Sequence, residues 1–409
     1  MSGRTPLVDP ARFPILARAV NGRRLVYLDN AATTQKPDSV IAATEAYYST
    51  ENANINRSAH ALSHASTRRY EESRARLALH LGVSAEEIIF TKGCTEAINL
   101  AARSWGDSVL KPGDRVLLPE NEHHANIVPW QMAAERTGAV VQPIPIRDDC
   151  RVDLDALALM LAEGGVRLVG VKQICNATGI VNPVAEIGEM ARRHGALVLV
   201  DGAQGLAHLS GSLADLPIDF YAISGHKAYG PMGVGALWVR GEVLASMPPF
   251  LGGGDMIRHV SFEKTTFAEG PQRFEAGTPN VAGAAGLACA LDFLAELEPG
   301  SLDAHEASLR EEAEEALRGI PGITIIGEGS PKAGIVSFVL EGVHPHDLAT
   351  ILDRQGVAVR TGHHCCQPLM RRLGLPATVR ASFAAYNGSD DIAVLAEAVE
   401  RGRRIFADA

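Results

Sequence analysis

The chain has 409 residues, so its length predicts two domains or one large domain with an appendage. Hydrophobic residues make up 46% and charged residues 21%, which is typical of a soluble globular enzyme with a large core. The formal net charge is −10 and no long basic block is present. Nucleic acid and anionic membrane surfaces are therefore disfavoured as partners.

The N-terminal segment MSGRTPLVDPARFPIL has no apolar core and no small-residue cleavage site, which argues against a signal peptide. No apolar stretch approaches the roughly 20 residues that span a bilayer. Six cysteines are scattered without a CxxC pair. This usage predicts a reducing, cytoplasmic setting with free thiols.

Short apolar runs alternate with amphipathic stretches from Val26 to about Pro279. Helices are expected at 95–105, 126–138 and 184–195, the last two closing with a glycine. Strands are expected at 87–93, 114–120, 166–173, 196–204, 220–224 and 235–240. This alternation predicts an α/β domain with a mostly parallel sheet.

The pattern changes after residue 290. Helices are expected at 302–319, 346–356 and 390–406, and strands at 322–327 and 335–340. We therefore predict a large domain over 26–290 and a smaller α+β domain formed by 1–25 and 291–409. The glycine-rich segment 251–260, within the larger domain, is interpreted as a linker or as a mobile flap over a site.

A lysine follows a predicted buried strand in ISGHKAYGPMGVGAL. Glycines of this density let the backbone approach a ligand closely. Lys227 is thus a candidate for imine formation, because a partly desolvated amine is nucleophilic. The alternative is a solvated loop lysine.

Asp201 ends another predicted strand, at the carboxyl edge where open α/β sheets bind ligands. A carboxylate there can keep the ring nitrogen of a pyridine cofactor protonated. The alternative is a helix N-cap. Gln204, three residues on, could reach the same ligand.

Two further signals are weaker. The strand-to-helix segment FTKGCTEAINLAA places backbone N–H groups and a helix N-terminus around Thr95, which suits a phosphate, although threonine also caps helices without any ligand. In NEHHANIVPW, His123 or His124 could stack on a ring or carry a proton, or both could be loop histidines without a function. Taken together, the four signals fit pyridoxal 5′-phosphate (PLP).

The segment VAVRTGHHCCQPLM could be a metal site, a redox pair or a single reactive thiol. Adjacent residues of an extended segment point to opposite faces, and no second ligand pair of the zinc type is present. A disulfide between Cys365 and Cys366 would be strained. The single thiol is favoured, without a metal.

Over nearly its full length the chain resembles the fold-type I PLP enzymes of the class V aminotransferase group. Within that group it resembles the SufS-type (type II) cysteine desulfurases and the similar selenocysteine lyases. The matching motifs are YLDNAATTQKP, NEHHANIVPWQM, VDGAQ, SGHKAYGPMGVGAL, LGGGDMI, RFEAGTPN, VAVRTGHHCCQPLM and VRASFAAYN. The resemblance implies a large domain with a seven-stranded type of sheet and a smaller domain that carries the nucleophile.

The resemblance also implies the cofactor contacts. Lys227 would hold PLP as an imine, Asp201 would pair with the ring nitrogen, and His123 would stack on the ring. The ring hydroxyl would meet Asn176 and Gln204. The phosphate would meet Thr95, Ser224, His226 and, from a partner subunit, Thr278 of AGTP.

For the substrate, the resemblance implies that Arg380 clamps the carboxylate, with Arg360, Arg57 and Asn176 nearby. Cys365 matches the nucleophile of R-x-G-H-H-C. L-Cysteine would become L-alanine, leaving a persulfide on Cys365.

Implied partners are a second copy of the chain and a SufE- or SufU-like sulfur acceptor for iron–sulfur cluster assembly. The alternative activities are a selenocysteine lyase, an aminotransferase or a thiol- or metal-binding protein. Two features depart from the family pattern: Cys366 replaces a small non-thiol residue, and NINRSAHALS carries Asn56 and Ser58 in place of histidine and glycine.

Overall fold

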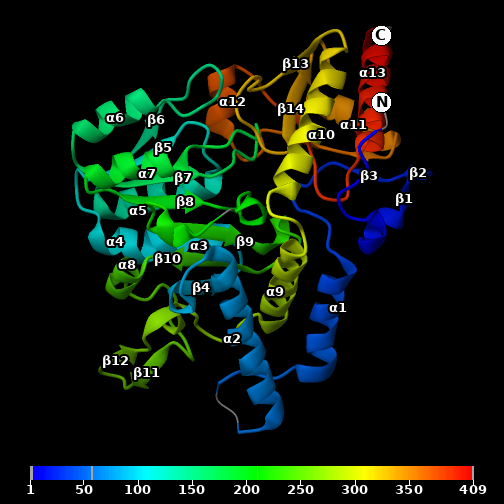
Figure 1. Cartoon of the computed structure of the whole chain (residues 1–409). Coiled ribbons are helices and arrows are strands. Elements are labelled where there is room, and N and C mark those ends of the chain that lie inside the picture. Colours follow the sequence, from blue (N-terminus) through cyan, green and yellow to red (C-terminus); the bar gives the residue numbers. More distant parts are fainter. Residues whose placement is uncertain (1–2, 57–58, 210, 408–409) are drawn as a thin grey trace.

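The computed structural model describes residues 3–56, 59–209 and 211–407. Its main feature is a seven-stranded sheet in the order β4-β10-β9-β8-β7-β5-β6 (Figure 1). The strands are β4 Ile88–Thr91, β5 Arg115–Pro119, β6 Val140–Ile144, β7 Val166–Lys172, β8 Leu197–Asp201, β9 Phe220–Ser224 and β10 Gly235–Val239. From β9 to β6 neighbouring strands are parallel, whereas β10 is antiparallel to both β9 and β4. The predicted mostly parallel sheet is confirmed.

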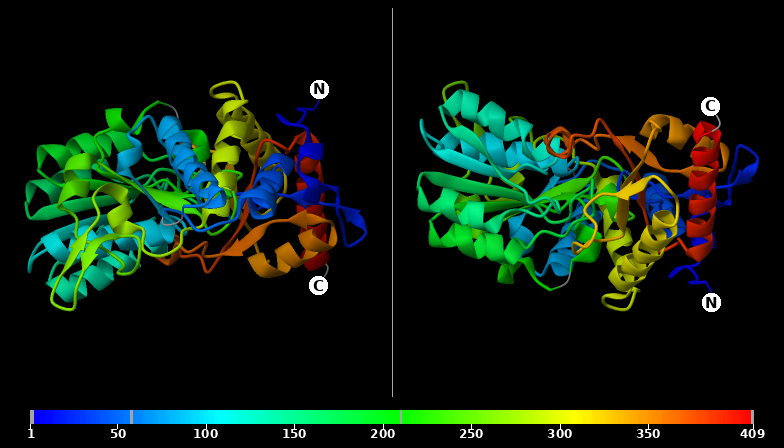
Figure 2. Two further views of the ribbon diagram at one scale, coloured as in Figure 1. Left: turned by 90° about the horizontal axis from the view of Figure 1, so that it is seen from below. Right: turned by 90° about the horizontal axis from the view of Figure 1, so that it is seen from above.

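Helices cover both faces of this sheet (Figure 2), which explains why its central strands are apolar throughout. In β8, Val198 and Val200 pack into one core and Leu199 into the other. The helices of this part are α1 Asp38–Ala46, α2 Ala61–Leu81, α3 Cys94–Ala101, α4 Asp107–Val109, α5 Val128–Thr137, α6 Leu154–Ala162, α7 Val184–Arg193, α8 Gly241–Ser246 and α9 Val281–Ala295. All three helices expected here are present.

Glycines end both helices for which they were predicted, although in α7 the glycine lies one residue beyond the cap. Gly138 caps α5 with φ 78°, its N–H donating to the Ala134 carbonyl. In α7 the cap is His194, and Gly195 adopts the left-handed conformation one residue later. The helix expected over 95–105 is α3 followed by a π-helical turn, Ala102–Gly106.

The C-terminal part forms an antiparallel sheet in the order β13-β14-β17-β16. Val26 and Leu28 pack into the core of this sheet with residues such as Phe338, far from them in sequence. The strands are β13 Ile323–Ile325, β14 Ile335–Leu340, β16 Arg360–Gly362 and β17 Thr378–Ser382, and the helices are α10 Ser301–Arg318, α11 Pro345–Arg354, α12 Gln367–Leu373 and α13 Ser389–Ala407. A short parallel pair, β3 Val26–Tyr27 with β15 Val357–Ala358, joins the N-terminal segment to this part. The residue limits of the two domains stay a prediction.

Two hairpins and several short turns complete the chain. The hairpins are β1 Ala19–Val20 with β2 Arg23–Arg24, and β11 Ile257–Val260 with β12 Thr265–Phe267. The second follows the glycine-rich segment 251–256, and its residues do not line the cavity described below. The 3-10 and further π-helical turns are Pro10–Arg12, Pro14–Ala17, Tyr47–Glu51, Ala85–Glu87, His124–Asn126, Leu206–His208, Leu213–Asp215, Gly225–Lys227 and Gly270–Phe274.

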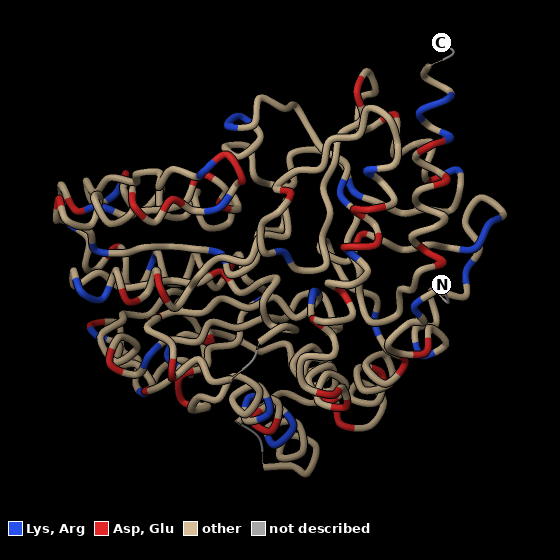
Figure 3. The backbone as a smooth tube through the Cα atoms, turned by 45° about the horizontal axis from the view of Figure 1, so that its top comes forward, with Lys and Arg blue, Asp and Glu red and all other residues tan. Residues whose placement is uncertain are grey.

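The distribution of charged residues and the state of the cysteines are as the sequence predicts. Acidic and basic residues are interspersed over the backbone trace (Figure 3). All six cysteines are free thiols. Within the described residues, no helix has both the length and the apolar character needed to cross a bilayer.

Candidate active site

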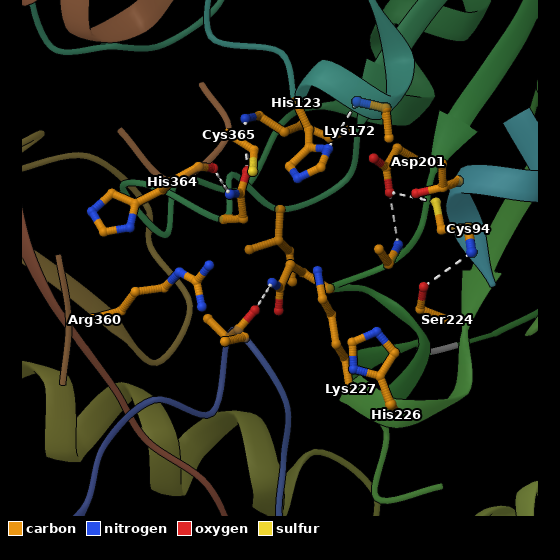
Figure 4. A pocket seen from close by; sticks show the side chains of 18 of the residues that line it. Cys94, His123, Lys172, Asp201, Ser224, His226, Lys227, Arg360, His364 and Cys365 are labelled. Atoms are coloured by element: carbon orange, nitrogen blue, oxygen red, sulfur yellow. Dashed lines mark hydrogen bonds between the residues drawn. The ribbon is translucent and has the colours of Figure 1, made fainter. Parts of the chain in front are cut away.

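A cavity of about 240 Å³ lies at the carboxyl edge of β7, β8 and β9, between the two sheets. Figure 4 shows the side chains that point into it. All but two of the residues predicted for the site line this one cavity, namely Thr95, His123, Asn176, Asp201, Gln204, Ser224, His226, Lys227, Arg360, Cys365 and Arg380.

The two exceptions are Thr278 and Arg57. Thr278 is exposed and lines a separate cavity with Lys92, Phe274 and Glu275. Its predicted role in another subunit's site stays a prediction. Arg57 lies outside the described residues.

Lys227 and Asp201 come from neighbouring strand ends. Lys227 closes a 3-10 turn directly after β9, and burial lowers its pKa, which favours the neutral and nucleophilic amine. Asp201 is the last residue of β8 and is 5% exposed. Its Oδ1 accepts the backbone N–H of Ala203 at 2.9 Å and the thiol of Cys94 at 3.1 Å. The carboxylate therefore caps a tight turn and does not begin a helix.

The N-terminus of α3 faces the opposite end of the cavity from the nucleophile segment (Figure 4). Thr95 lies in its first turn, and the backbone N–H of Cys94 donates to Ser224 Oγ at 3.0 Å. Burial lowers the pKa of His226 to about 4, and its Nδ1 has no hydrogen-bond partner within the described residues. An unpartnered ring nitrogen beside a helix N-terminus suits a phosphate.

His123 lines the cavity as a neutral ring. Burial lowers its pKa to about 4. Its Nδ1 accepts the backbone N–H of Ala125 at 3.0 Å, so the proton of the neutral ring is on Nε2. An uncharged aromatic face is thereby presented to a ligand.

Cys365 lies half-buried at the cavity, on a segment with unusual backbone geometry. His364 and Cys365 have φ values of 50° and 55°, a left-handed conformation that residues other than glycine rarely adopt. Three hydrogen bonds hold it: Cys365 N to His363 Nδ1 at 3.1 Å, His124 N to the Cys365 carbonyl at 2.8 Å, and Asn176 Nδ2 to the His364 carbonyl at 2.7 Å. The histidines of this motif therefore shape the loop, and no cluster of three side chains suited to a metal occurs in the described residues.

Cys366 does not line the cavity. It is fully buried in an apolar cluster with Cys175 and Leu369. Burial raises the pKa of its thiol to about 12, so it stays protonated at neutral pH. Of the two adjacent cysteines, only Cys365 lines the cavity.

Two guanidinium groups, from β16 and β17, surround one carboxylate. Arg380 of β17 is 2% exposed, donating from Nη2 to Asp29 Oδ1 at 3.0 Å and from Nη1 to the Asn176 carbonyl at 2.7 Å. Its Nε has no partner in the described residues. Arg360 approaches Asp29 at 3.8 Å. This unused buried donor suits a second carboxylate.

Two residues of the site, Lys172 and Asp29, were not predicted from the sequence. Lys172 ends β7 as Asp201 ends β8, and the two residues pair in register. The rule that ligands bind at strand carboxyl ends could have identified it. Asp29, within the YLDNAATTQKP motif, had no local signal of its own.

Known proteins support this picture. The class V aminotransferase family model matches residues 26–395. A probable cysteine desulfurase of Xylella fastidiosa is 46% identical over 396 residues, covering 97% of this chain and 95% of the relative. A cysteine desulfurase of Dickeya dadantii is 46% identical over 400 residues, covering 97% of both chains.

Solved structures agree. The cysteine desulfurase CsdA of Escherichia coli superposes with a TM-score of 0.90 at 40% identity, covering 97% of each chain. A cystine C-S lyase mutant carrying glycine linked covalently to its PLP cofactor superposes with a TM-score of 0.82 at 26% identity, covering 96% of this chain and 99% of that one. The chain belongs to the class V aminotransferase family.

Proposed function

We propose that the chain is a PLP-dependent cysteine desulfurase that converts L-cysteine to L-alanine and retains the sulfur on Cys365. One observation carries the proposal: Cys365 lies at a cavity that also holds a half-buried lysine, Lys227, and a buried carboxylate, Asp201. A general aminotransferase has no use for a thiol there. The relatives named above as cysteine desulfurases support the same choice.

The cavity fits PLP. Lys227 would bind the aldehyde carbon, and Asp201 would meet the ring nitrogen. The α3 N-terminus with the unpartnered His226 Nδ1 would receive the phosphate. When bound, the cofactor supplies an electron sink that weakens bonds at the substrate α-carbon.

The chain's own residues direct the sulfur transfer. Arg380 binds the substrate carboxylate through its free Nε, which orients the thiol of L-cysteine toward Cys365. The Cys365 thiolate attacks the substrate sulfur, so that an S–S bond forms while the substrate C–S bond breaks. Lys227 moves the proton lost from the α-carbon. The balance is L-cysteine plus enzyme thiol giving L-alanine plus enzyme persulfide.

We further propose the SufS type, a cytoplasmic homodimer, and delivery of sulfur to a SufE- or SufU-like acceptor for iron–sulfur cluster assembly. The half-buried position of Cys365 supports transfer to another protein's thiol. Thr278, exposed and outside the cavity, supports completion of the site by a second copy. Sedimentation that finds only active monomer would contradict the dimer.

Selenocysteine lyase is the neighbouring activity, and the same cavity would accept selenocysteine. The names of the relatives favour cysteine as substrate. The test measures sulfide and alanine release from L-cysteine by wild type and Cys365→Ala, with L-selenocysteine in parallel. Loss of cysteine activity alone in the variant supports a desulfurase thiol. Full cysteine activity in the variant rejects the proposal.

A further inference from the structure

A second lysine, Lys172, lies buried beside the site. It is 2% exposed at the end of β7. Its backbone N–H donates to Glu122 Oε2 at 2.9 Å, and its carbonyl accepts the side chain of Asn182 at 2.7 Å. A buried amine on a rigidly held strand end is costly unless it is paired, so its contacts call for an explanation.

The amine of Lys172 is a charged donor. Burial lowers its pKa, but Cys175, Cys366 and Glu122 outweigh burial and leave the pKa above its ordinary value. Among these groups only Glu122 is a carboxyl group, and it is fully buried. Burial in turn raises the pKa of Glu122 to about 7, although Lys172 opposes this.

Lys172, Cys366 and Asn176 form a closed triangle. Lys172 Nζ lies 3.2 Å from Asn176 Oδ1 and 3.4 Å from Cys366 Sγ. The Cys366 thiol lies 3.2 Å from the same Asn176 Oδ1. One amide oxygen therefore accepts from two buried donors.

This arrangement fixes which way the Asn176 amide faces. With its oxygen toward the ammonium of Lys172, its nitrogen donates to the His364 carbonyl at 2.7 Å, immediately before Cys365. A flipped amide would set its NH₂ against the ammonium and its oxygen against a carbonyl, losing every one of these bonds. Figure 4 shows Lys172 reaching toward this segment.

We infer that Lys172 is a positioning residue for sulfur transfer, which acts through the Asn176 amide to hold the segment carrying Cys365. The inference rests on the proposed function and gives a role to two features that the sulfur transfer itself does not use, the second lysine and the second thiol. The small Cys366 thiol accepts a hydrogen bond from the Lys172 amine and donates one to the Asn176 side-chain oxygen. The left-handed backbone of His364 and Cys365 needs such a restraint, because it is unfavourable by itself.

The test uses the PLP-loaded enzyme and the variants Lys172→Met and Asn176→Ala, singly and together. Lys172→Met keeps the length of the side chain and removes the donor. Alkylation of Cys365 by iodoacetamide, measured by peptide mapping, is expected to rise about tenfold, since a hydrogen bond to a charged group is lost. The kcat is expected to fall by a similar factor while KM for L-cysteine changes little, because Arg380 keeps its contacts.

A double variant tests whether Lys172 acts through Asn176. In the Asn176→Ala background, Lys172→Met is expected to add nothing to the alkylation rate. The matched control is Lys332→Met, which removes another buried lysine, bound to the Ile326 carbonyl and Glu314, away from the cavity. This control is expected to leave the alkylation rate of Cys365 at the wild-type value.

Additive effects of the two substitutions, or a folded Lys172→Met enzyme with wild-type alkylation and kcat, would overturn the inference. An equal rise in alkylation in Lys332→Met would do the same, because it would show a general loosening. If wild type releases no sulfide, the proposed function fails by itself. The alkylation measurements still report whether Lys172 holds the segment of Cys365.

Discussion

Arg380→Lys tests how the cavity recognises a substrate carboxylate. The guanidinium uses Nη1 and Nη2 within the protein and leaves Nε free. Lysine keeps the charge but cannot donate hydrogen bonds to the Asn176 carbonyl, Asp29 and a substrate at once in the geometry of the guanidinium. The substitution therefore removes one hydrogen bond to a charged group, which contributes roughly 1.5–3 kcal/mol. The expected fall in kcat/KM for L-cysteine is about tenfold to about 150-fold.

The assay is sulfide release at varied L-cysteine concentration, with the bound PLP measured in each preparation. Arg310→Lys is the matched control, because Arg310 is also largely buried with an unpartnered Nε but pairs with Glu311 and Glu314 away from the cavity. The control is expected to keep the wild-type kcat/KM. A folded, PLP-loaded Arg380→Lys enzyme with wild-type kcat/KM would refute the assignment of the carboxylate to Arg380.

Two other predictions concern the thiols and the histidines. Cys366→Ala is expected to keep most of the wild-type activity, because the Cys366 thiol does not line the cavity and Lys172 keeps its own contact with Asn176; a loss as deep as that of Cys365→Ala would show that the second thiol takes part in the reaction. Burial lowers the pKa of His123 and His226 to about 4 and that of His364 to about 3, below the value of about 6.5 in an unfolded chain. As the pH falls below 6.5, these histidines take up protons in the unfolded state before they do so in the folded state. The free energy of unfolding therefore falls between pH 6.5 and pH 4, by up to about 1.4 kcal/mol per pH unit for each histidine. Urea unfolding across this range checks the slope, and His364→Gln is expected to reduce it; an unchanged slope would show that His364 does not contribute to the loss of stability in acid.

Much of the site could be predicted from sequence because its residues follow strand ends. Lys227, Asp201 and Thr95 stand where β9, β8 and β4 give way to loops, and parallel strands bring their carboxyl ends to one edge. Cys365 lies in the loop after β16, and Arg380 lies in β17 of the other sheet. No local pattern places them against that edge, so they depended on the family resemblance.

The features that could not be predicted have physical causes. Strand β6 lies at the edge of the sheet, is partly exposed and contains Pro143, so its sequence lacks the apolar run of a buried strand. The contact of Lys172 with Cys366 joins residues 194 positions apart. Cys366 meets both Lys172 and Asn176 because the segment after β16 packs against the end of β7, which no single segment encodes.

The final position of the sulfur distinguishes Cys365 from its neighbour Cys366 as the nucleophile. The PLP-loaded enzyme would be mixed with L-cysteine, trapped with a thiol-alkylating reagent and digested, and the fragment ions between Cys365 and Cys366 would be read by mass spectrometry. We predict that the mass of one additional sulfur atom is found on Cys365 and is absent from Cys366. An additional sulfur on Cys366, or none on either cysteine while sulfide is released, would contradict the proposed reaction.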